Sequence, residues 1–367
     1  MRILFLADAQ SSHTQKWVAG LSEKGFDIHL FSLHNPPDNW YDPKVKIYSL
    51  GLNEDIKELS EKSIKKFIYF KAVKKIRQII KSIKPDILHS HYASSYGLLG
   101  SLVNFHPFII SVWGSDIESF PNKSFLHKLI IRYSLKKADK ILSTSRYLAY
   151  KTNGIVQKKI YVIPFGVDIE KFRQDDSKDE PHHSDIIVGT IKSLEVIYGI
   201  DLLIRAFSLV KNQNQTIPLK LLIVGKGTQE KKLKELASSL LNPEDYLFQG
   251  YVTHDMIPEF HNKIDIPVYL SRMESFGVSV IESMSCSKPV IVSGVGGLKE
   301  IVNDGIDGII VPSEDIQLTA NAIEKMAVNP ELRLCLGKNG REKVLKYYNW
   351  NDNLKQMISI YNDMNNG

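Results

Sequence analysis

Two glutamates, Glu274 and Glu282, lie on either side of a glycine in the stretch Met273–Met284. A pair of carboxylates can carry acid/base chemistry, and two-carboxylate glycoside hydrolases hold theirs within roughly 5–10 Å. On one helix these two would lie about 12 Å apart along the axis and about 80° apart around it. That separation favours contacts with different parts of one long ligand. The alternative is a capping glutamate and a surface glutamate.

The residues between the two glutamates predict a loop that leads into a helix. Phe276 and Gly277 suit a tight loop, and Val278, Ile281 and Met284 follow at helical spacing as a buried face. A glycine at this junction lets a ligand approach the backbone N–H groups of the helix start. Such a helix start binds phosphate groups well.

Two further segments could join this site, because each follows a predicted strand. Lys192 follows the strand 185–189, and Gly225 follows the strand 219–224. The carboxyl ends of parallel strands share one edge of an open α/β sheet, where ligands bind. Lys192 offers a compact positive charge for a phosphate group; otherwise it is a solvated loop lysine.

The first half of the chain carries a second set of candidates at predicted strand ends. His13 closes the loop 8–13, and Gly114 and Asp116 lie just beyond the strand 107–112. Their position at the sheet edge makes them candidates for contact with a ligand. His13 can equally be an ordinary loop histidine.

The composition is that of a globular protein with two full cores. The chain has 367 residues, of which 43% are hydrophobic and 24% charged. Its two cysteines make neither a disulfide framework nor a metal cluster. His89 and His91 are expected to point to opposite sides of their strand, and therefore not to share a metal ion. No run of about 18 apolar residues occurs, so no membrane span is expected.

Positive charge is concentrated in the first half of the chain. Residues 1–168 hold 25 Lys/Arg against 14 Asp/Glu, and the remainder holds 22 against 27. Within the segment 56–84, isoleucines recur at helical spacing and lysines fill the other faces, among them Lys65, Lys66, Lys74 and Lys75. This predicts a helix whose basic face is either solvated or rests on an anionic membrane surface. Few aromatic residues interleave with the lysines, so nucleic acid is not expected as a partner.

Alternating strand and helix patterns predict the α/β class, with two doubly wound domains. Residues 173–184 contain almost no apolar side chains and are typical of a linker. We therefore expect an N-terminal domain over 1–172 and a C-terminal domain over 185–348. A helix within 349–367 is expected to cross back onto the first domain.

The stretch Glu274–Glu282, with Phe276-Gly277 inside it, resembles the signature of glycosyltransferase family 4, the retaining enzymes of GT-B fold. Ser287–Ile291, Gly296–Val302 and Asp304–Pro312 look like the same family, and the resemblance runs in order from about residue 185 to 345. It implies two Rossmann-like domains that face each other across a cleft. A nucleotide diphosphate sugar would bind mainly to the second domain and an acceptor to the first.

The resemblance also implies roles for single residues. Glu282 would bind the ribose hydroxyls, Glu274 the sugar or the backbone that positions it, and Lys192 the departing diphosphate. The expected catalytic residues are Glu274, Lys192 and Asp116; the donor-binding residues are Glu282, Phe276, Gly277, Val278, Gly225 and Val252; the acceptor-binding residues are His13 and Gly114.

The chain departs from the family pattern in its cationic positions. Thr190 and Tyr198 stand where family members usually carry an arginine and a lysine, and Trp113 stands where a histidine is common. Many members also have a glycine-rich loop where this chain has 8–13, which contains no glycine. Charge for the diphosphate must then come from Lys192 and from the helix start at Gly277.

The expected activity is a retaining hexosyl or N-acetylhexosaminyl transfer in cell-surface polysaccharide synthesis. The donor would be a nucleotide diphosphate sugar such as a UDP sugar, and the acceptor a lipid-linked or other glycan. No Asp-x-Asp motif occurs, so neither a catalytic metal nor a cofactor is expected. The protein is expected in the cytoplasm, peripheral on the inner face of the cell membrane. A nucleotide-sugar epimerase of the same fold and a non-catalytic sugar-nucleotide binding partner are the alternatives.

Overall fold

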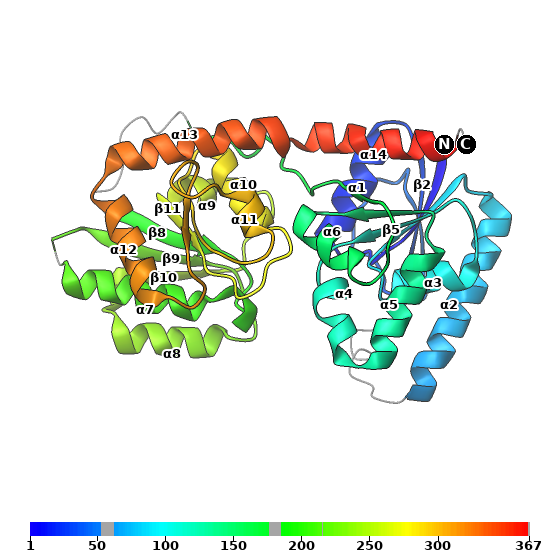
Figure 1. Ribbon diagram of the computed structural model, residues 1–367, viewed down its shortest axis with the longest axis horizontal. Coiled ribbons are helices and arrows are strands. Elements are labelled where there is room, and N and C mark those ends of the chain that lie inside the picture. Colours follow the sequence, from blue (N-terminus) through cyan, green and yellow to red (C-terminus); the bar gives the residue numbers. More distant parts are fainter. Residues whose placement is uncertain (53–61, 176–184, 215, 366–367) are drawn as a thin grey trace. The chain divides into compact units, whose positions relative to one another are not determined.

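The computed structural model of the chain describes residues 1–52, 62–175, 185–214 and 216–365, with the backbone alone over 62–67 (Figure 1). The chain forms two compact units. One contains Met1–Pro164 together with Asp352–Gly367, and the other contains Phe165–Asn351. Of the predicted linker 173–184, residues 176–184 lie outside the described residues.

The first unit is built on a seven-stranded parallel sheet with the order β3-β2-β1-β4-β5-β6-β7. Its strands are β1 (Arg2–Leu6), β2 (Asp27–Ser32), β3 (Lys46–Ser49), β4 (Ile87–His91), β5 (Phe108–Val112), β6 (Lys140–Ser143) and β7 (Ile160–Val162). The strand order reverses between β1 and β4. A crevice for ligands therefore opens at the carboxyl ends of these two strands.

Helices cover both faces of this sheet. They are α1 (Ser12–Glu23), α2 (Lys62–Ile83), α3 (Tyr96–Val103), α4 (Ser115–Glu118), α5 (Phe125–Lys137), α6 (Arg146–Asn153) and α14 (Trp350–Asn365), with a 3-10 turn at η2 (Phe120–Lys123). Leu4, Leu88 and Ile110 pack in one core with α2, α3 and α5. Side chains alternate along a strand, so the intervening residues face α1 and α14.

The predicted basic helix is present as α2. Its apolar side chains Ala72, Ile76 and Ile79 are buried against the sheet, whereas Lys74 and Lys75 are exposed. Lys65 and Lys66 lie in the part whose side chains are outside the described residues. None of the helices in the described part of the chain has the length and apolar character that a membrane crossing requires.

The second unit contains a six-stranded parallel sheet with the order β10-β9-β8-β11-β12-β13. Its strands are β8 (Ile186–Ile191), β9 (Leu219–Val224), β10 (Tyr246–Gly250), β11 (Ile266–Tyr269), β12 (Ile291–Ser293) and β13 (Ile309–Val311). Here the order reverses between β8 and β11. This is again the place where a ligand crevice is expected.

Helices pack on both faces of the second sheet as well. They are α7 (Ile200–Gln213), α8 (Glu230–Leu240), α9 (Ile257–Lys263), α10 (Val278–Ser285), α11 (Leu298–Ile301), α12 (Ile316–Ala327) and α13 (Pro330–Tyr347), with 3-10 turns at η3 (Val196–Tyr198) and η4 (Pro243–Asp245). Val188 and Leu221 pack with α7 and α12, whereas Ile191 and Leu222 pack with α9. The predicted α/β class with two doubly wound sheets is confirmed.

Buried histidines line the face of the first sheet toward α14. His89 Nε2 lies 2.7 Å from Ser111 Oγ, and its Nδ1 lies 2.7 Å from the Tyr361 hydroxyl of α14. The rings of His89 and His91 are 5.0 Å apart on the same face. The expectation that they point to opposite sides is wrong, because residues two apart in a strand point the same way.

We expect these buried histidines to make the protein lose stability as the pH falls below about 6.5. Burial lowers the pKa of His89 to about 3 and holds that of His91 well below its ordinary value. The unfolded chain therefore takes up protons that the native state does not bind. The free energy of unfolding should fall by up to about 1.4 kcal/mol per pH unit for each histidine. Urea unfolding at about pH 7.5 and about pH 5 measures this loss.

Two variants test whether His89 is the cause. His89→Gln should show a smaller pH dependence than the wild-type protein, because an amide does not titrate. His254→Gln alters an exposed histidine and should keep the wild-type dependence. An equal loss of free energy in all three proteins would contradict this explanation.

Candidate active site

An ion pair occupies the crevice of the second sheet. Lys192 follows β8, Glu274 lies in the loop after β11, and these two strands are neighbours where the strand order reverses. Lys192 Nζ lies 2.6 Å from Glu274 Oε2, and the two side chains are 12% and 15% exposed. The structure thus joins two of the predicted catalytic residues.

The surroundings of Lys192 keep its ammonium charged. Burial is the largest single effect and acts to lower the pKa of Lys192. The charge of Glu274, the effect of Tyr198, the hydrogen bond to Glu274 and the charge of Glu282 together outweigh burial, so the pKa is raised. The ammonium also lies 4.5 Å from the centre of the Tyr198 ring. An ammonium has three donors, so the bond to Glu274 leaves capacity for an anionic ligand.

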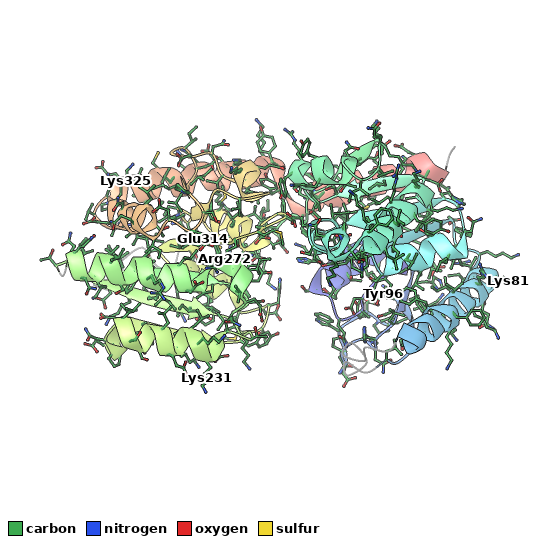
Figure 2. All side chains as sticks on the ribbon, turned by 60° about the horizontal axis from the view of Figure 1, so that its bottom comes forward. Lys81, Tyr96, Lys231, Arg272, Glu314 and Lys325 are labelled. Carbon is green, nitrogen blue, oxygen red and sulfur yellow. The ribbon has the colours of Figure 1, made fainter. Side chains whose placement is uncertain are left out.

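The loop that carries Glu274 is fixed by contacts of Glu274 itself and of Arg272. The backbone N–H of Gly297 donates to the Glu274 carbonyl at 2.8 Å. Arg272 pairs with Asp201 at the start of α7 at 2.8 Å and with Glu314 at 2.7 Å; Figure 2 labels Arg272 and Glu314. These contacts fix the backbone and therefore the direction of the Glu274 side chain.

The expected helix start is α10, with Gly277 at its N-cap. Gly277 has a φ of 117°, which only glycine adopts easily, and no side chain caps this end of the helix. Phe276 is buried against Phe165, at 6.0 Å between ring centres. The predicted buried face needs one correction. Val278 is only half-buried, and Val280 is buried together with Ile281 and Met284.

Glu282 belongs to a polar network that the sequence reading missed. His261 Nε2 lies 3.4 Å from Glu282 Oε2, and His261 Nδ1 lies 2.9 Å from Ser283 Oγ, which is 2.8 Å from the Tyr269 hydroxyl. His261 is fully buried, so this network fixes the Glu282 side chain. An apolar helix face is indicated by the spacing of Ile257, Phe260, His261 and Ile264. A histidine on such a face is the sequence feature that could have indicated this buried polar network.

Two predicted donor-site residues have packing roles near this crevice. Gly225 has a φ of 137°, and a Cβ there would lie 2.0 Å from the Lys192 carbonyl oxygen. A glycine is therefore required for the loop after β9 to approach Lys192. Val252 is half-buried and packs against the apolar cluster of Phe260 and its neighbours.

The remaining candidates lie in the first unit and come together there. His13 is in the first turn of α1, and its ring centre is 5.9 Å from that of Trp113. Asp116 is buried and accepts backbone hydrogen bonds from Ala93 at 2.8 Å, Gly114 at 2.9 Å and Trp113 at 3.2 Å. Burial raises the pKa of Asp116 against the opposite effect of these amides. This geometry gives Asp116 a positioning role for the Trp113–Gly114 loop.

Thr190, which stands where family members usually carry an arginine, lies in the sheet beside the crevice. The Thr190 hydroxyl is buried in β8, and it has no hydrogen-bond partner among the residues that the structure describes. A hydroxyl is neutral, so Thr190 supplies no charge to the crevice. Within the described residues, no group of three or more His, Cys, Asp and Glu side chains could hold a metal ion.

Comparison with protein families gives two matches that together cover most of the chain. The family described as "Glycosyl transferase 4-like" matches residues 2–145. The family described as "Glycosyl transferases group 1" matches residues 171–343. The second match contains Lys192, Glu274 and Glu282, and the first contains His13.

One glycosyltransferase sequence and two solved structures are similar to this chain over almost its whole length. The capsular polysaccharide biosynthesis glycosyltransferase CapM of Staphylococcus aureus is 26% identical over 93% of this chain and 91% of its own length. The sucrose-phosphate synthase structure from Thermosynechococcus elongatus has a TM-score of 0.84 at 20% identity, with 99% and 98% coverage. Anabaena HepE in complex with UDP-glucose has a TM-score of 0.79 at 18% identity, with 99% and 100% coverage. The structural likenesses establish the GT-B fold.

The ion pair should show strong energetic coupling. Lys192→Met leaves the Glu274 carboxylate without its cationic partner. Glu274→Gln leaves the Lys192 ammonium without its anionic partner, and the double variant removes both charges. We expect each single variant to be destabilised and the double variant to regain part of the loss, with a coupling energy of about 1–3 kcal/mol. Urea unfolding of the four proteins measures it.

An exposed pair on α8 provides the matched control. Lys231, labelled in Figure 2, lies 4.0 Å from Glu235, and both side chains are largely exposed. Its coupling should not exceed about 0.5 kcal/mol. Equal coupling in the two cycles would mean that Lys192 and Glu274 behave as a surface pair.

Proposed function

The chain belongs to the group 1 glycosyltransferases of the family 4 type, and from this premise we propose that it transfers a hexosyl or N-acetylhexosaminyl residue from a UDP sugar to a glycan acceptor. Transfer retains the configuration at the anomeric carbon and serves the synthesis of a cell-surface polysaccharide. The observation that carries this proposal is the ion pair of Lys192 and Glu274 in the crevice of the second sheet.

In the proposed reaction, the bond from the anomeric carbon to the diphosphate oxygen breaks, and its electron pair stays on the diphosphate. The acceptor hydroxyl forms the new bond on the same face of the sugar, and its proton passes to the departing diphosphate oxygen. Lys192 and the helix start at Gly277 stabilise the charge that develops on the leaving group. Glu282 binds the ribose hydroxyls, and Glu274 orients Lys192 and the sugar.

The acceptor is proposed to be lipid-linked and to bind the first unit. His13 and the Trp113–Gly114 loop, which Asp116 holds, lie at the carboxyl edge of its sheet. The exposed lysines of α2 favour a position on the inner, anionic face of the cell membrane. The protein would then meet a lipid-linked acceptor where that lipid resides.

Incubation with labelled nucleotide sugars and membrane lipid extract tests the function. Labelled sugar should appear in a lipid-linked or glycan product. Free epimerised sugar would instead identify a nucleotide-sugar epimerase. Binding of a nucleotide sugar without turnover would identify a non-catalytic partner, and either result would overturn the proposal.

The transfer should persist in the presence of EDTA. Lys192 and backbone amides carry the leaving-group charge in this mechanism, so no divalent cation is needed. The assay is repeated with EDTA and then with added magnesium or manganese. Loss of transfer with EDTA and its recovery with either cation would contradict the metal-free mechanism.

Glu282→Gln should weaken the binding of free UDP. A carboxylate accepts from both ribose hydroxyls with charge-assisted bonds, and an amide oxygen does so less strongly. The expected loss is about 1.5–3 kcal/mol, measured by calorimetric titration. Glu331→Gln changes an exposed glutamate of α13 and should leave the affinity unchanged. A folded Glu282→Gln variant with wild-type affinity would remove Glu282 from the nucleotide site.

A further inference from the structure

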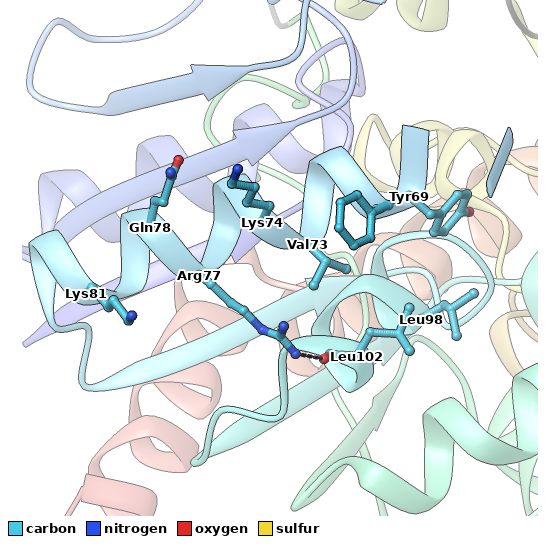
Figure 3. A pocket seen from close by; sticks show the side chains of 9 residues that line it. Tyr69, Val73, Lys74, Arg77, Gln78, Lys81, Leu98 and Leu102 are labelled. Carbon is cyan, nitrogen blue, oxygen red and sulfur yellow. Dashed lines mark hydrogen bonds between the residues drawn. The ribbon is translucent and has the colours of Figure 1, made fainter. Parts of the chain in front are cut away.

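An apolar groove runs between α2 and α3 on the first unit (Figure 3). Its walls include Tyr69, Phe70 and Val73 from α2 and Leu98 and Leu102 from α3. Its volume is about 800 Å³, which is in the range of sites that bind drug-sized ligands. Phe70 is 70% exposed and Leu102 is 38% exposed, so apolar surface faces solvent here at a cost in free energy.

One edge of this groove is cationic. The charged residues that line it in the described part of the chain, Lys74, Arg77 and Lys81, all carry positive charge. Arg77 Nη2 donates to the Leu102 carbonyl at 2.8 Å, at the C-terminal end of α3, as Figure 3 shows. This bond fixes the guanidinium beside the groove and leaves most of its N–H donors for a ligand.

The neighbouring helix α5 continues the same pattern. It packs on α3, which also contacts α2, so the three helices form one layer on the sheet. Leu126, Leu129 and Tyr133 have the spacing of one helix face and are exposed, although they are large and apolar. Lys128 and Arg132, also exposed, lie between them in the sequence and beside that face on the helix. Exposed apolar side chains among cations are typical of helices that lie in a membrane interface.

We propose that the groove binds an acyl chain of an anionic membrane lipid, whose phosphate headgroup contacts Lys74, Arg77 and Lys81. Apolar walls beside a cationic edge match a ligand that is itself apolar at one end and anionic at the other. Nucleic acid matches the cations but leaves the apolar walls exposed. The inference gives a location to the membrane contact in the proposed function and rests on that function for its biological role.

Vesicle sedimentation and fluorescence quenching test this assignment on the full chain. The protein should bind phosphatidylcholine vesicles that contain phosphatidylglycerol. Its affinity for pure phosphatidylcholine vesicles should be lower by a factor of about ten or more. Lys74→Gln/Lys81→Gln should weaken binding to the anionic vesicles by a similar factor. Phe70→Ser should weaken it as well, and neither change affects the buried face of α2.

The variant Phe70→Trp reports whether an acyl chain enters the groove. Its added tryptophan should be quenched by vesicles with brominated acyl chains, beyond any quenching of the wild-type protein and its four tryptophans. Vesicle binding without this extra quenching would overturn the chain-binding site and leave a purely electrostatic contact. Equal binding to neutral vesicles would overturn the role of the three cations.

Matched controls lie in the second unit. Lys231→Gln/Lys232→Gln changes two exposed lysines, and Leu334→Ser changes an exposed large apolar residue; both should leave vesicle binding unchanged. Equal effects of the control and groove variants would overturn the assignment. So would groove variants that leave vesicle binding intact but lower the oligomeric state in analytical ultracentrifugation, because the groove would then bind a second copy of the chain.

Transfer to a short water-soluble acceptor separates this inference from the proposed function. Groove variants should retain that transfer while they lose vesicle binding. If the groove variants lost transfer to the soluble acceptor as strongly as they lost vesicle binding, a role of the groove confined to lipid binding would be contradicted. If the wild-type protein binds vesicles through the groove but transfers no sugar, the lipid site stands and the proposed function fails.

Discussion

The ion pair of Lys192 and Glu274 depends on the strand order of the second sheet. The chain leaves β8 toward β9 on one side and leaves β11 toward β12 on the other, so the loops that follow them diverge and open a crevice. The two loops still touch at their base. A Cβ at Gly199 would lie 2.1 Å from the Leu270 carbonyl oxygen, which requires a glycine at this position. Residues just beyond either strand therefore face a common space, whatever their separation in sequence.

The formal charges in this crevice constrain how a diphosphate can bind. Lys192, Glu274 and Glu282 together carry one net negative charge, and a diphosphate adds more. The ligand must therefore share Lys192 with Glu274 and must draw on the partial positive charge at the start of α10. The arrangement has an advantage for catalysis. Because Glu274 already holds the ammonium, Lys192 need not reorganise when charge develops on the leaving group.

Strand ends and the loop-to-helix junction could be predicted from the sequence, because hydrophobic runs and glycines mark them locally. This was enough to place Lys192, Glu274 and Gly277 at one sheet edge. The partners of side chains could not be predicted, because they come from distant elements. His261 contacts Glu282 from another helix, and the Asp116 carboxylate is occupied by backbone amides of two loops. The placement of Val278 failed for a simpler reason, since apolar spacing does not tell which side of a short helix faces the core.

The first unit separates its charges in a way that suits an amphiphilic acceptor. Near the carboxyl edge of its sheet, burial keeps His89 and His91 neutral, and Asp116 directs its oxygens to backbone amides. The two histidines therefore add no charge to that edge. The cations of α2 and α5 lie instead on the outer surface of the helical layer. In the proposed function, the phosphate of a lipid-linked acceptor would contact the cations of the helical layer, and its sugar would contact the carboxyl edge of the sheet. The strength of membrane binding could then change without altering the groups that contact the sugar.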